Sequence, residues 1–263
     1  MNAHRPRKRF GQHFLADPGV IDAIVQAISP RQDDIVVEIG PGRGAITGLL
    51  AAKAGHLHCV ELDRDLAALL RQRYADNHKV TIHEADALAF DYTALGESLR
   101  VVGNLPYNIS TPLLFRLLDQ RDCIADMHFM LQKEVVDRMA AVPGSKAYGR
   151  LGIMLGCHLE VHALFDVDPQ CFVPPPAVTS AVVRLSPLPS GHFEIANEKM
   201  LGSTVATAFS QRRKTLRNAL KSLVNEAELE ALGIDATARP ETLAIRDYVA
   251  LANYLARRVD DSG

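Results

Sequence analysis

Three apolar, strand-like runs of this sequence end in residues suited to binding an adenosine. The first, residues 35–39, is followed by Gly40, Gly42 and Gly44, and glycine lets the backbone approach a ligand that a Cβ atom would push away. The second ends at Glu61, whose carboxylate can accept hydrogen bonds from both hydroxyls of a ribose. The third is followed by Asp86, which can accept from the amino group of an adenine. Each acid alone would be a solvated loop carboxylate, but the ordered set favours a ligand that contains adenosine.

A fourth run, residues 99–103, leads into an Asn-Leu-Pro-Tyr turn at 104–107. On its own this turn could be loop punctuation before a helix that Ser110 caps, with Pro112 in the first turn. In combination with the three preceding strand ends, it helps to decide which adenosine cofactor is bound.

These strand ends require a scaffold that brings them to one edge of a sheet. Strand-like runs alternate with helical patterns up to about residue 132, which predicts βαβ units, a mostly parallel Rossmann-like sheet and helices on both faces. Two later runs, 157–165 and 179–188, have the character of antiparallel closing strands, and from about 197 the pattern is helical. We therefore expect an α/β catalytic domain over 1–188, with a basic arm at 1–16, and a small all-α domain over 189–263.

Composition restricts the class of protein further. The chain has 263 residues, of which 48% are hydrophobic, and contains no apolar run of the roughly 18 residues needed to span a bilayer. Its N-terminal segment lacks the apolar stretch of a secretory signal, so a cytoplasmic location is expected. The four cysteines are isolated, as buried reduced thiols are, and the His158 and His162 pair lacks a zinc-binding pattern, so no metal is expected.

The net charge of −2 conceals two basic segments. Positive side chains without acids cluster at 5–9, which include Arg7, Lys8 and Arg9, and at 209–221. The second cluster consists of Arg212, Arg213, Lys214, Arg217 and Lys221, which a continuous helix would place beside a separate stripe of Leu216, Leu220 and Leu223. Concentrated positive charge on an acidic body suits a nucleic-acid phosphate backbone; a solvated face and a flexible tail are the alternative.

The four strand ends together resemble the class I S-adenosylmethionine-dependent methyltransferases, and among them the enzymes that methylate the exocyclic N6 atom of adenine. The N6 lone pair is delocalised into the purine ring, so the amine is a poor nucleophile. The resemblance implies that Asn104 Oδ1 and the Leu105 carbonyl hold the two N6 hydrogens and favour a pyramidal amine. It also implies that Pro106 fixes the turn and that Tyr107 stacks on the base.

Motifs along the chain resemble, more narrowly, the family of bacterial small-subunit ribosomal RNA dimethyladenosine transferases. In order and spacing they are RKRFGQHFL, VEIGPGRGAIT, VVGNLPYNISTPLLF, DMHFMLQKEVVDRM, SKAYGRLG, FVPPPAVTSAVVRL and FSQRRKTLRNAL. The resemblance implies a monomeric enzyme that dimethylates two adjacent adenosines in a hairpin loop near the 3′ end of 16S rRNA, on a precursor of the 30S subunit.

The same resemblance assigns roles residue by residue. Cofactor contacts are implied for Gln12, His13, Leu15, Gly40, Gly42, Gly44, Glu61, Leu62, Asp86, Ala87 and Asn104. His13 departs from the asparagine of many members, so contact through its side chain or only its backbone stays open. Phe172 matches an aromatic that packs against the flipped base opposite Tyr107; core packing is the alternative for this ring.

Three other functions remain as alternatives. An NAD-dependent dehydrogenase would use the first two strand ends but would not need the Asn-Leu-Pro-Tyr turn. A methyltransferase of the antibiotic-resistance type would methylate one adenine of large-subunit RNA, although FSQRRKTLRNAL matches the small-subunit group. An assembly factor would bind the immature subunit as its main task.

Overall fold

The computed structural model describes residues 13–211 and 213–260. The described residues form two compact units, one containing 13–136 together with 161–187, and the other containing 137–160 together with 188–211 and 213–260. The chain crosses between the units at 136/137, 160/161 and 187/188. Residues 137–160, which we expected in the catalytic domain, belong to the second unit.

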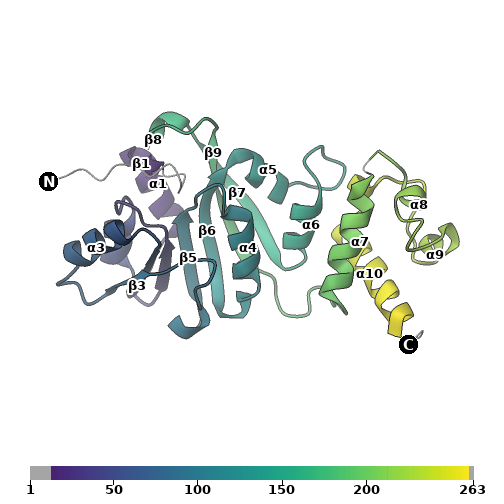
Figure 1. The fold of residues 1–263 in the computed structure, drawn as a ribbon, viewed down its shortest axis with the longest axis horizontal. Helices are drawn as coiled ribbons and strands as arrows, with labels where there is room; N and C mark the ends of the chain where they lie inside the picture. The colour runs from purple at the N-terminus through teal and green to yellow at the C-terminus, as the bar shows by residue number, and fades with distance from the viewer. Residues whose placement is uncertain (1–12, 212, 261–263) are drawn as a thin grey trace. The chain divides into compact units, whose positions relative to one another are not determined.

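The first unit is built on a seven-stranded sheet with the order β4-β3-β2-β5-β6-β9-β7 (Figure 1). Strands β2 to β6 run parallel, and β9 pairs antiparallel with β6. This arrangement confirms the predicted α/β class, a mostly parallel sheet, and β9 is an antiparallel closing strand as expected. The strands are β2 (Ile35–Ile39), β3 (His56–Glu61), β4 (Val80–Glu84), β5 (Leu99–Asn104), β6 (Ile124–Gln132), β7 (Leu159–Val167) and β9 (Ser180–Pro187).

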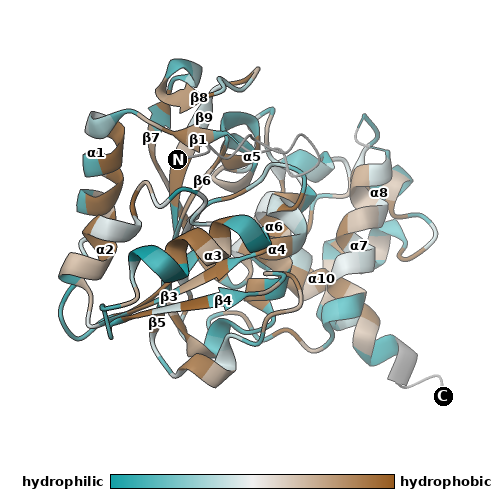
Figure 2. Ribbon diagram, turned by 60° about the vertical axis from the view of Figure 1, so that its left-hand side comes forward, coloured by the Kyte–Doolittle hydropathy of each residue, from teal (hydrophilic) through white to brown (hydrophobic). Residues whose placement is uncertain are grey.

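Helices cover the sheet where their apolar residues can be buried. One core cluster joins α1 and α2 to the sheet through residues such as Ile28, Leu50 and Val102. Figure 2 shows hydrophobic residues along the central strands and hydrophilic ones on α3. The helices are α1 (Pro18–Ile28), α2 (Thr47–Lys53), α3 (Arg64–Arg73), α4 (Ser110–Leu118) and α5 (Lys133–Met139), with short 3-10 turns η2 (Thr93–Leu95), η3 (Arg121–Cys123) and η4 (Pro169–Cys171).

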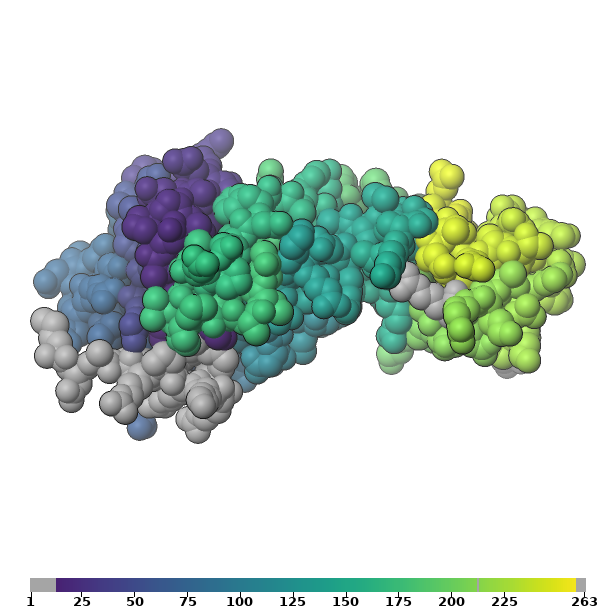
Figure 3. Space-filling view, turned by 90° about the horizontal axis from the view of Figure 1, so that it is seen from above, coloured from purple at the N-terminus to yellow at the C-terminus, as the bar shows by residue number. Residues whose placement is uncertain are grey.

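A short second sheet connects the beginning of the described chain to its later part. β1 (Phe14–Leu15) pairs antiparallel with β8 (Phe172–Val173), in the register Leu15 opposite Phe172. In the space-filling view of Figure 3, the purple part near the beginning of the chain and the green part of its later half adjoin. The pairing places His13 and Leu15 beside the loop that precedes β9.

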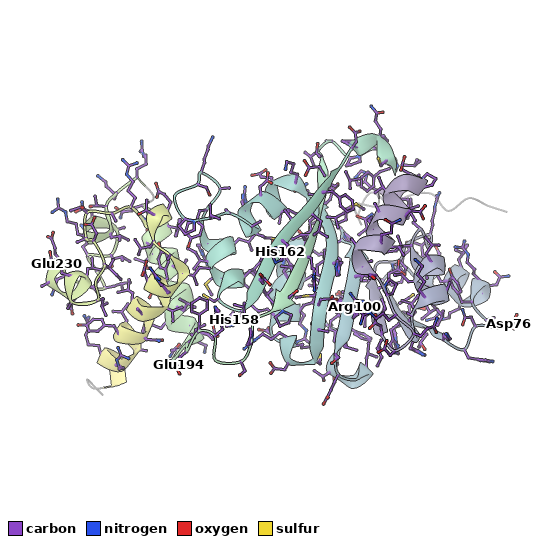
Figure 4. The ribbon with its side chains drawn as sticks, turned by 180° about the vertical axis from the view of Figure 1, so that it is seen from behind. Asp76, Arg100, His158, His162, Glu194 and Glu230 are labelled. Atoms are coloured by element: carbon purple, nitrogen blue, oxygen red, sulfur yellow. The ribbon has the colours of Figure 1, made fainter. Side chains whose placement is uncertain are left out.

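At the opposite end of the sheet, Arg100 joins three elements. Its guanidinium donates to Asp126 Oδ2 (2.8 Å), to Asp34 Oδ2 (2.8 Å) and to the Ile28 carbonyl at the end of α1 (2.6 Å). Arg100 is labelled on the sheet in Figure 4. The network fixes α1 against β5 and β6 and lies away from the carboxyl ends of the strands.

The second unit is helical, as expected. Its core contains Tyr148 and Ile153, from 137–160, together with Leu201, Val205 and Tyr248. Burial of these side chains explains why 137–160 belongs here although no linker-like composition separates it from β6. Its elements are α6 (Arg150–Gly156), α7 (Glu198–Ser210), α8 (Leu216–Ala219), α9 (Glu226–Ala231), η5 (Pro240–Thr242) and α10 (Ile245–Asp260).

The predicted continuous helix over 209–221 is wrong. α7 ends at Ser210, and α8 is a single turn that begins at Leu216 after an extended Thr215 (φ −66°, ψ 160°). The N–H of Leu216 donates to the Ala238 carbonyl (2.8 Å), so a tertiary bond replaces the helical one at this point. The apolar stripe is partly confirmed, because Leu216 and Leu220 are fully buried.

Candidate active site

A cavity of about 400 Å³ lies at the carboxyl ends of β2, β3, β4 and β5, the edge at which open α/β sheets bind ligands. It brings together most of the residues that the sequence identified. The lining includes His13, Leu15, Gly40, Gly42, Glu61, Leu62, Asp86, Ala87, Asn104, Leu105, Pro106 and Tyr107. Gly44 and Phe172 do not line it, and Gln12 lies outside the described residues.

The glycine turn after β2 has the conformation that requires glycine. Gly40, Gly42 and Gly44 have φ of +63°, +59° and +82°. A Cβ on Gly44 would lie 2.9 Å from Arg73 Nη1, so this glycine allows close packing against α3. A Cβ on Gly42 would lie 3.2 Å from the Phe14 ring. The turn therefore brings backbone without a Cβ to the cavity at Gly40 and Gly42, and packs closely against α3 at Gly44.

Glu61 ends β3 inside the cavity. Its Oε2 accepts the Gly42 N–H (3.0 Å) and its Oε1 accepts the Asp63 N–H (2.8 Å). Burial raises the pKa of Glu61, while these two backbone donors oppose the shift. Each oxygen retains further acceptor capacity for a ribose hydroxyl.

Asp86 follows β4 at the exposed rim. Its Oδ1 accepts the Leu88 N–H (2.9 Å), which fixes the carboxylate in the loop. Buried Ala87 and half-exposed Leu62 give this part of the lining an apolar character. A carboxylate between apolar walls is suited to the amino group and flat faces of an adenine.

The end of β5 presents two acceptors. The Asn104 amide Nδ2 donates to the His13 carbonyl (3.1 Å). This hydrogen bond uses the donor end of the amide and not its acceptor, Oδ1. The Leu105 N–H donates to the Met130 carbonyl (3.2 Å), a bond that does not engage the Leu105 carbonyl. Ser110 does not cap α4 as predicted; it is the first helical residue, and its hydroxyl donates to the Tyr107 carbonyl (3.1 Å).

Tyr107 is held through its hydroxyl. The Tyr107 phenol and Ser180 Oγ are 2.8 Å apart, and Ser180 is fully buried at the start of β9. Burial raises the pKa of Tyr107. Ser180 was not identified from the sequence. A strand pattern does not indicate that the first residue of the strand forms a hydrogen bond with a turn more than seventy positions earlier.

The Phe172 ring is buried and does not line the cavity, and its predicted contact with a flipped base stays a prediction. Its side chain is 1% exposed in β8 and packs in the core with Leu15 and Val167. Because side chains alternate along a strand, burial of Phe172 turns Val173 outward, and Val173 lines the cavity with 57% exposure. The structure supports the core-packing alternative for Phe172.

Two buried ionisable residues on the cavity wall were not identified from the sequence. Glu38, in β2, is 2% exposed, and burial raises its pKa to about 7. His128, in β6, is 3% exposed, and burial lowers its pKa to about 4. In the sequence, each of these residues is marked only as a polar residue inside an apolar run. Both side chains make the wall polar; His128 is neutral near pH 7, whereas Glu38 titrates in this range.

The predicted RNA-binding residues are only partly described. Arg213, Lys214, Arg217 and Lys221 are exposed in the second unit, where Arg217 Nη1 lies 3.5 Å from Glu226 Oε1. Arg7, Lys8, Arg9 and Arg212 lie outside the described residues. Across 13–211 and 213–260, no helix is long and apolar enough to span a membrane, and no cluster of acidic, histidine and cysteine side chains could hold a metal ion.

The sheet, the glycine turn and the acidic strand ends define a class I methyltransferase. The model of the ribosomal RNA adenine dimethylase family matches residues 3–257, and the chain belongs to this family. It is therefore an rRNA adenine N6,N6-dimethyltransferase that uses S-adenosylmethionine. The NAD-dependent alternative is excluded by this membership.

Similar proteins cover nearly the whole chain. It is 53% identical to a ribosomal RNA small subunit methyltransferase A of Dechloromonas aromatica (strain RCB), over 97% of this chain and 100% of the relative. It is 55% identical to the protein of that name from Aromatoleum aromaticum (strain DSM 19018 / LMG 30748 / EbN1), over 98% and 97%.

Two solved structures share the fold. A dimethyladenosine transferase from Plasmodium falciparum has a TM-score of 0.83 and 27% identity, covering 94% of this chain and 98% of that one. The 23S rRNA methyltransferase ErmE has a TM-score of 0.75 and 26% identity, covering 92% and 99%.

Proposed function

We propose that this enzyme dimethylates two adjacent adenosines in a hairpin loop near the 3′ end of 16S rRNA, acting as a monomer in the cytoplasm on a late precursor of the small subunit. The observation that carries the proposal is 53 to 55% identity to small subunit methyltransferases over almost the full chain. Identity to the 23S rRNA methyltransferase ErmE is only 26%, although the fold is shared. The fold does not distinguish small-subunit RNA from large-subunit RNA as the substrate, but the sequence identity favours small-subunit RNA.

The cavity fits the methyl donor. The glycine turn gives an approach free of side chains, Glu61 is placed for the ribose hydroxyls, and Asp86 for the adenine amino group. Leu15, Leu62 and Ala87 supply apolar contact, and we extend the assignment to Gln12. S-adenosylmethionine supplies an electrophilic methyl group on its sulfonium.

The chain's own residues prepare the amine of the target base. Asn104 Oδ1 and the Leu105 carbonyl accept the two N6 hydrogens, which favours a pyramidal nitrogen whose lone pair is available for attack. The bond from Asn104 Nδ2 to the His13 carbonyl keeps the acceptor end of the amide turned toward the base. Pro106 stiffens the turn, and Tyr107 provides a face for stacking. No strong base is needed, because the methylated amine is acidic and loses its proton to water.

RNA docking is assigned to the basic residues at 7–9 and 212–221. Arg213, Lys214, Arg217 and Lys221 are exposed, so they can contact phosphates without reading the base sequence. Such contacts offset the few kcal/mol that removing an adenine from its stack costs.

The test is methylation of purified small subunits from a strain that lacks the activity, with the modified nucleotides mapped. Large subunits from the same strain are the matched control. We expect dimethylated adenosines at two neighbouring positions of 16S rRNA only. Modification of large-subunit RNA instead would assign the chain to the alternative substrate.

A further inference from the structure

Glu38 is a buried carboxylic acid in the cavity wall that the proposed methyl transfer does not use. It lies in β2, directly before the strand leads into the glycine turn, and is 2% exposed. Cys59 Sγ lies 3.8 Å from its Oε2, and a thiol is a weak donor. Among the residues that the structure describes, no arginine or lysine forms an ion pair with Glu38. A negative charge on this side chain therefore has little to stabilise it in the cofactor-free protein.

The groups that face Glu38 make its charge responsive to a ligand. Cys59 and Glu61 lie on the neighbouring strand β3, Thr47 begins α2, and Tyr74 follows the end of α3. Burial raises the pKa of Glu38 to about 7; the charge of Glu61 adds to the rise, while Thr47 and Cys59 oppose it. A carboxyl group with this pKa exchanges its proton near neutral pH, so a charged ligand in the cavity can change its state.

Acidic side chains outnumber basic ones in the described lining of the cavity. The acids are Glu38, Glu61, Asp63 and Asp86. Arg43 is the one arginine or lysine among the lining residues that the structure describes, and it is exposed, with its guanidinium 4.5 Å from the centroid of the Phe14 ring. A cavity with this excess of acid favours a ligand that carries positive charge.

The two forms of the cofactor differ in charge at one atom. The sulfur of S-adenosylmethionine is a sulfonium cation, and once the methyl group has left, the sulfur of the product S-adenosylhomocysteine is a neutral thioether. A carboxylate in the wall of the cavity therefore stabilises the methyl donor more than the product.

We propose that Glu38 is a selectivity-determining residue, whose negative charge makes the cavity bind the methyl donor in preference to the demethylated product. The inference rests on the proposed binding of the donor in this cavity. It also couples donor binding to pH. A positive ligand favours ionised Glu38, so the pKa of this group falls in the complex and a proton leaves as the donor binds. Donor affinity should therefore rise between about pH 6 and 8, and product affinity should rise less.

The experiment measures the affinities of the full-length wild type and Glu38→Gln for both forms of the cofactor, by titration calorimetry at about pH 6, 7 and 8. Glutamine keeps the size of the side chain but cannot become negative. At the highest pH, the ratio of product Kd to donor Kd should be roughly threefold to thirtyfold lower in Glu38→Gln than in the wild type. In the wild type this ratio should approach the glutamine value as the pH falls. Buffers of different ionisation enthalpy should show protons released on donor binding by the wild type, and fewer by Glu38→Gln.

Glu97→Gln is the matched control, because Glu97 is an exposed glutamate outside the cavity lining. Equal losses of donor and product affinity in Glu38→Gln overturn the proposal, and so does proton release that persists in this variant. The wild-type series needs no substitution, and a donor preference that does not change with pH also overturns the proposal. Glu61→Ala separates this result from the site assignment. If it leaves donor affinity unchanged, the proposed cofactor site itself is wrong, whereas a failure confined to Glu38 leaves that site in place.

Discussion

The two ends of the Asn104 amide are expected to make different contacts. Nδ2 donates to the His13 carbonyl, and we propose that Oδ1 accepts from the target amine. We expect Asn104→Ala to abolish methyl transfer while S-adenosylmethionine still binds within about tenfold, roughly 1.4 kcal/mol, because the side chain acts mainly on the amine. Single-turnover methylation and calorimetric titration measure the two effects. Normal turnover would remove Asn104 from the reaction.

Glu61 accepts two backbone N–H groups, and this makes the conservative substitution informative. In Glu61→Gln one oxygen becomes an NH₂ group that faces the N–H of either Gly42 or Asp63, donor against donor. We predict that Glu61→Gln and Glu61→Ala both weaken cofactor affinity at least tenfold, through disturbed geometry and unpaired ribose hydroxyls. Cofactor titration of each variant checks this, and unchanged affinity would take Glu61 out of the site.

Glu38 gives the cofactor-free protein a pH-dependent stability. Burial raises its pKa from 4.5 to about 7, so the folded state binds more protons than the unfolded state between these values. The stabilisation is therefore complete below about pH 4.5 and is lost as the pH rises through about 7. Relative to Glu38→Gln, wild-type unfolding free energy should fall by about 2–3 kcal/mol over this interval. Urea unfolding of both proteins across the pH range measures it, and parallel curves would contradict the assignment.

Among elements, the strands were easier to predict than the basic segment. Apolar runs with ligands at their ends located Glu61, Asp86 and Asn104 correctly in one cavity, because parallel strands bring their carboxyl ends to one edge. The spacing of Arg213, Arg217 and Lys221 matches the period of a helix, but these residues do not lie on one continuous helix. Hydrogen bonds from Leu216 and Arg217 to Ala238 and Ala236 decide the local backbone, and such distant partners leave no mark on local periodicity.

Segment 209–221 is not one helix, but its described basic side chains are exposed to solvent. We predict that reversing Arg212, Arg213 and Lys214 to glutamate weakens binding to the small subunit and flattens its dependence on salt, because fewer counterions are released. Cofactor affinity should be unchanged, since the cavity lies in the first unit. Lys53→Glu, at the exposed end of α2, is the control for a charge reversal elsewhere. A wild-type salt slope in the triple variant would move RNA docking to other residues.

At the scale of the whole chain, the two units are not consecutive in sequence. A change in composition lies near the crossing at 187/188, but the sequence of 137–160 gave no signal for the crossings at 136/137 and 160/161. Tyr148, Ile153 and Cys157 are nearly fully buried with residues that come after 188. Packing partners so far along the chain cannot be inferred from a single segment.

This interleaving predicts the behaviour of a fragment. A chain ending at 188 would expose Tyr148, Ile153 and Cys157 to water, so we expect it to aggregate or to melt well below the full chain. Thermal unfolding and light scattering of the fragment and the full protein make the comparison. A monomeric fragment with the full chain's melting midpoint would show that 137–160 does not depend on the residues after 188.

The pairing of β1 with β8 also sets an order of events during translation. Leu15 leaves the ribosome early, but its partner Phe172 is synthesised only after most of the sheet. His13 and Leu15 therefore cannot take their places in the cavity wall until the chain beyond Val173 has left the exit tunnel. A nascent chain of this enzyme cannot complete the wall of this cavity while the first unit is still being made, so we expect a ligand of the cavity to bind only late in synthesis or after release.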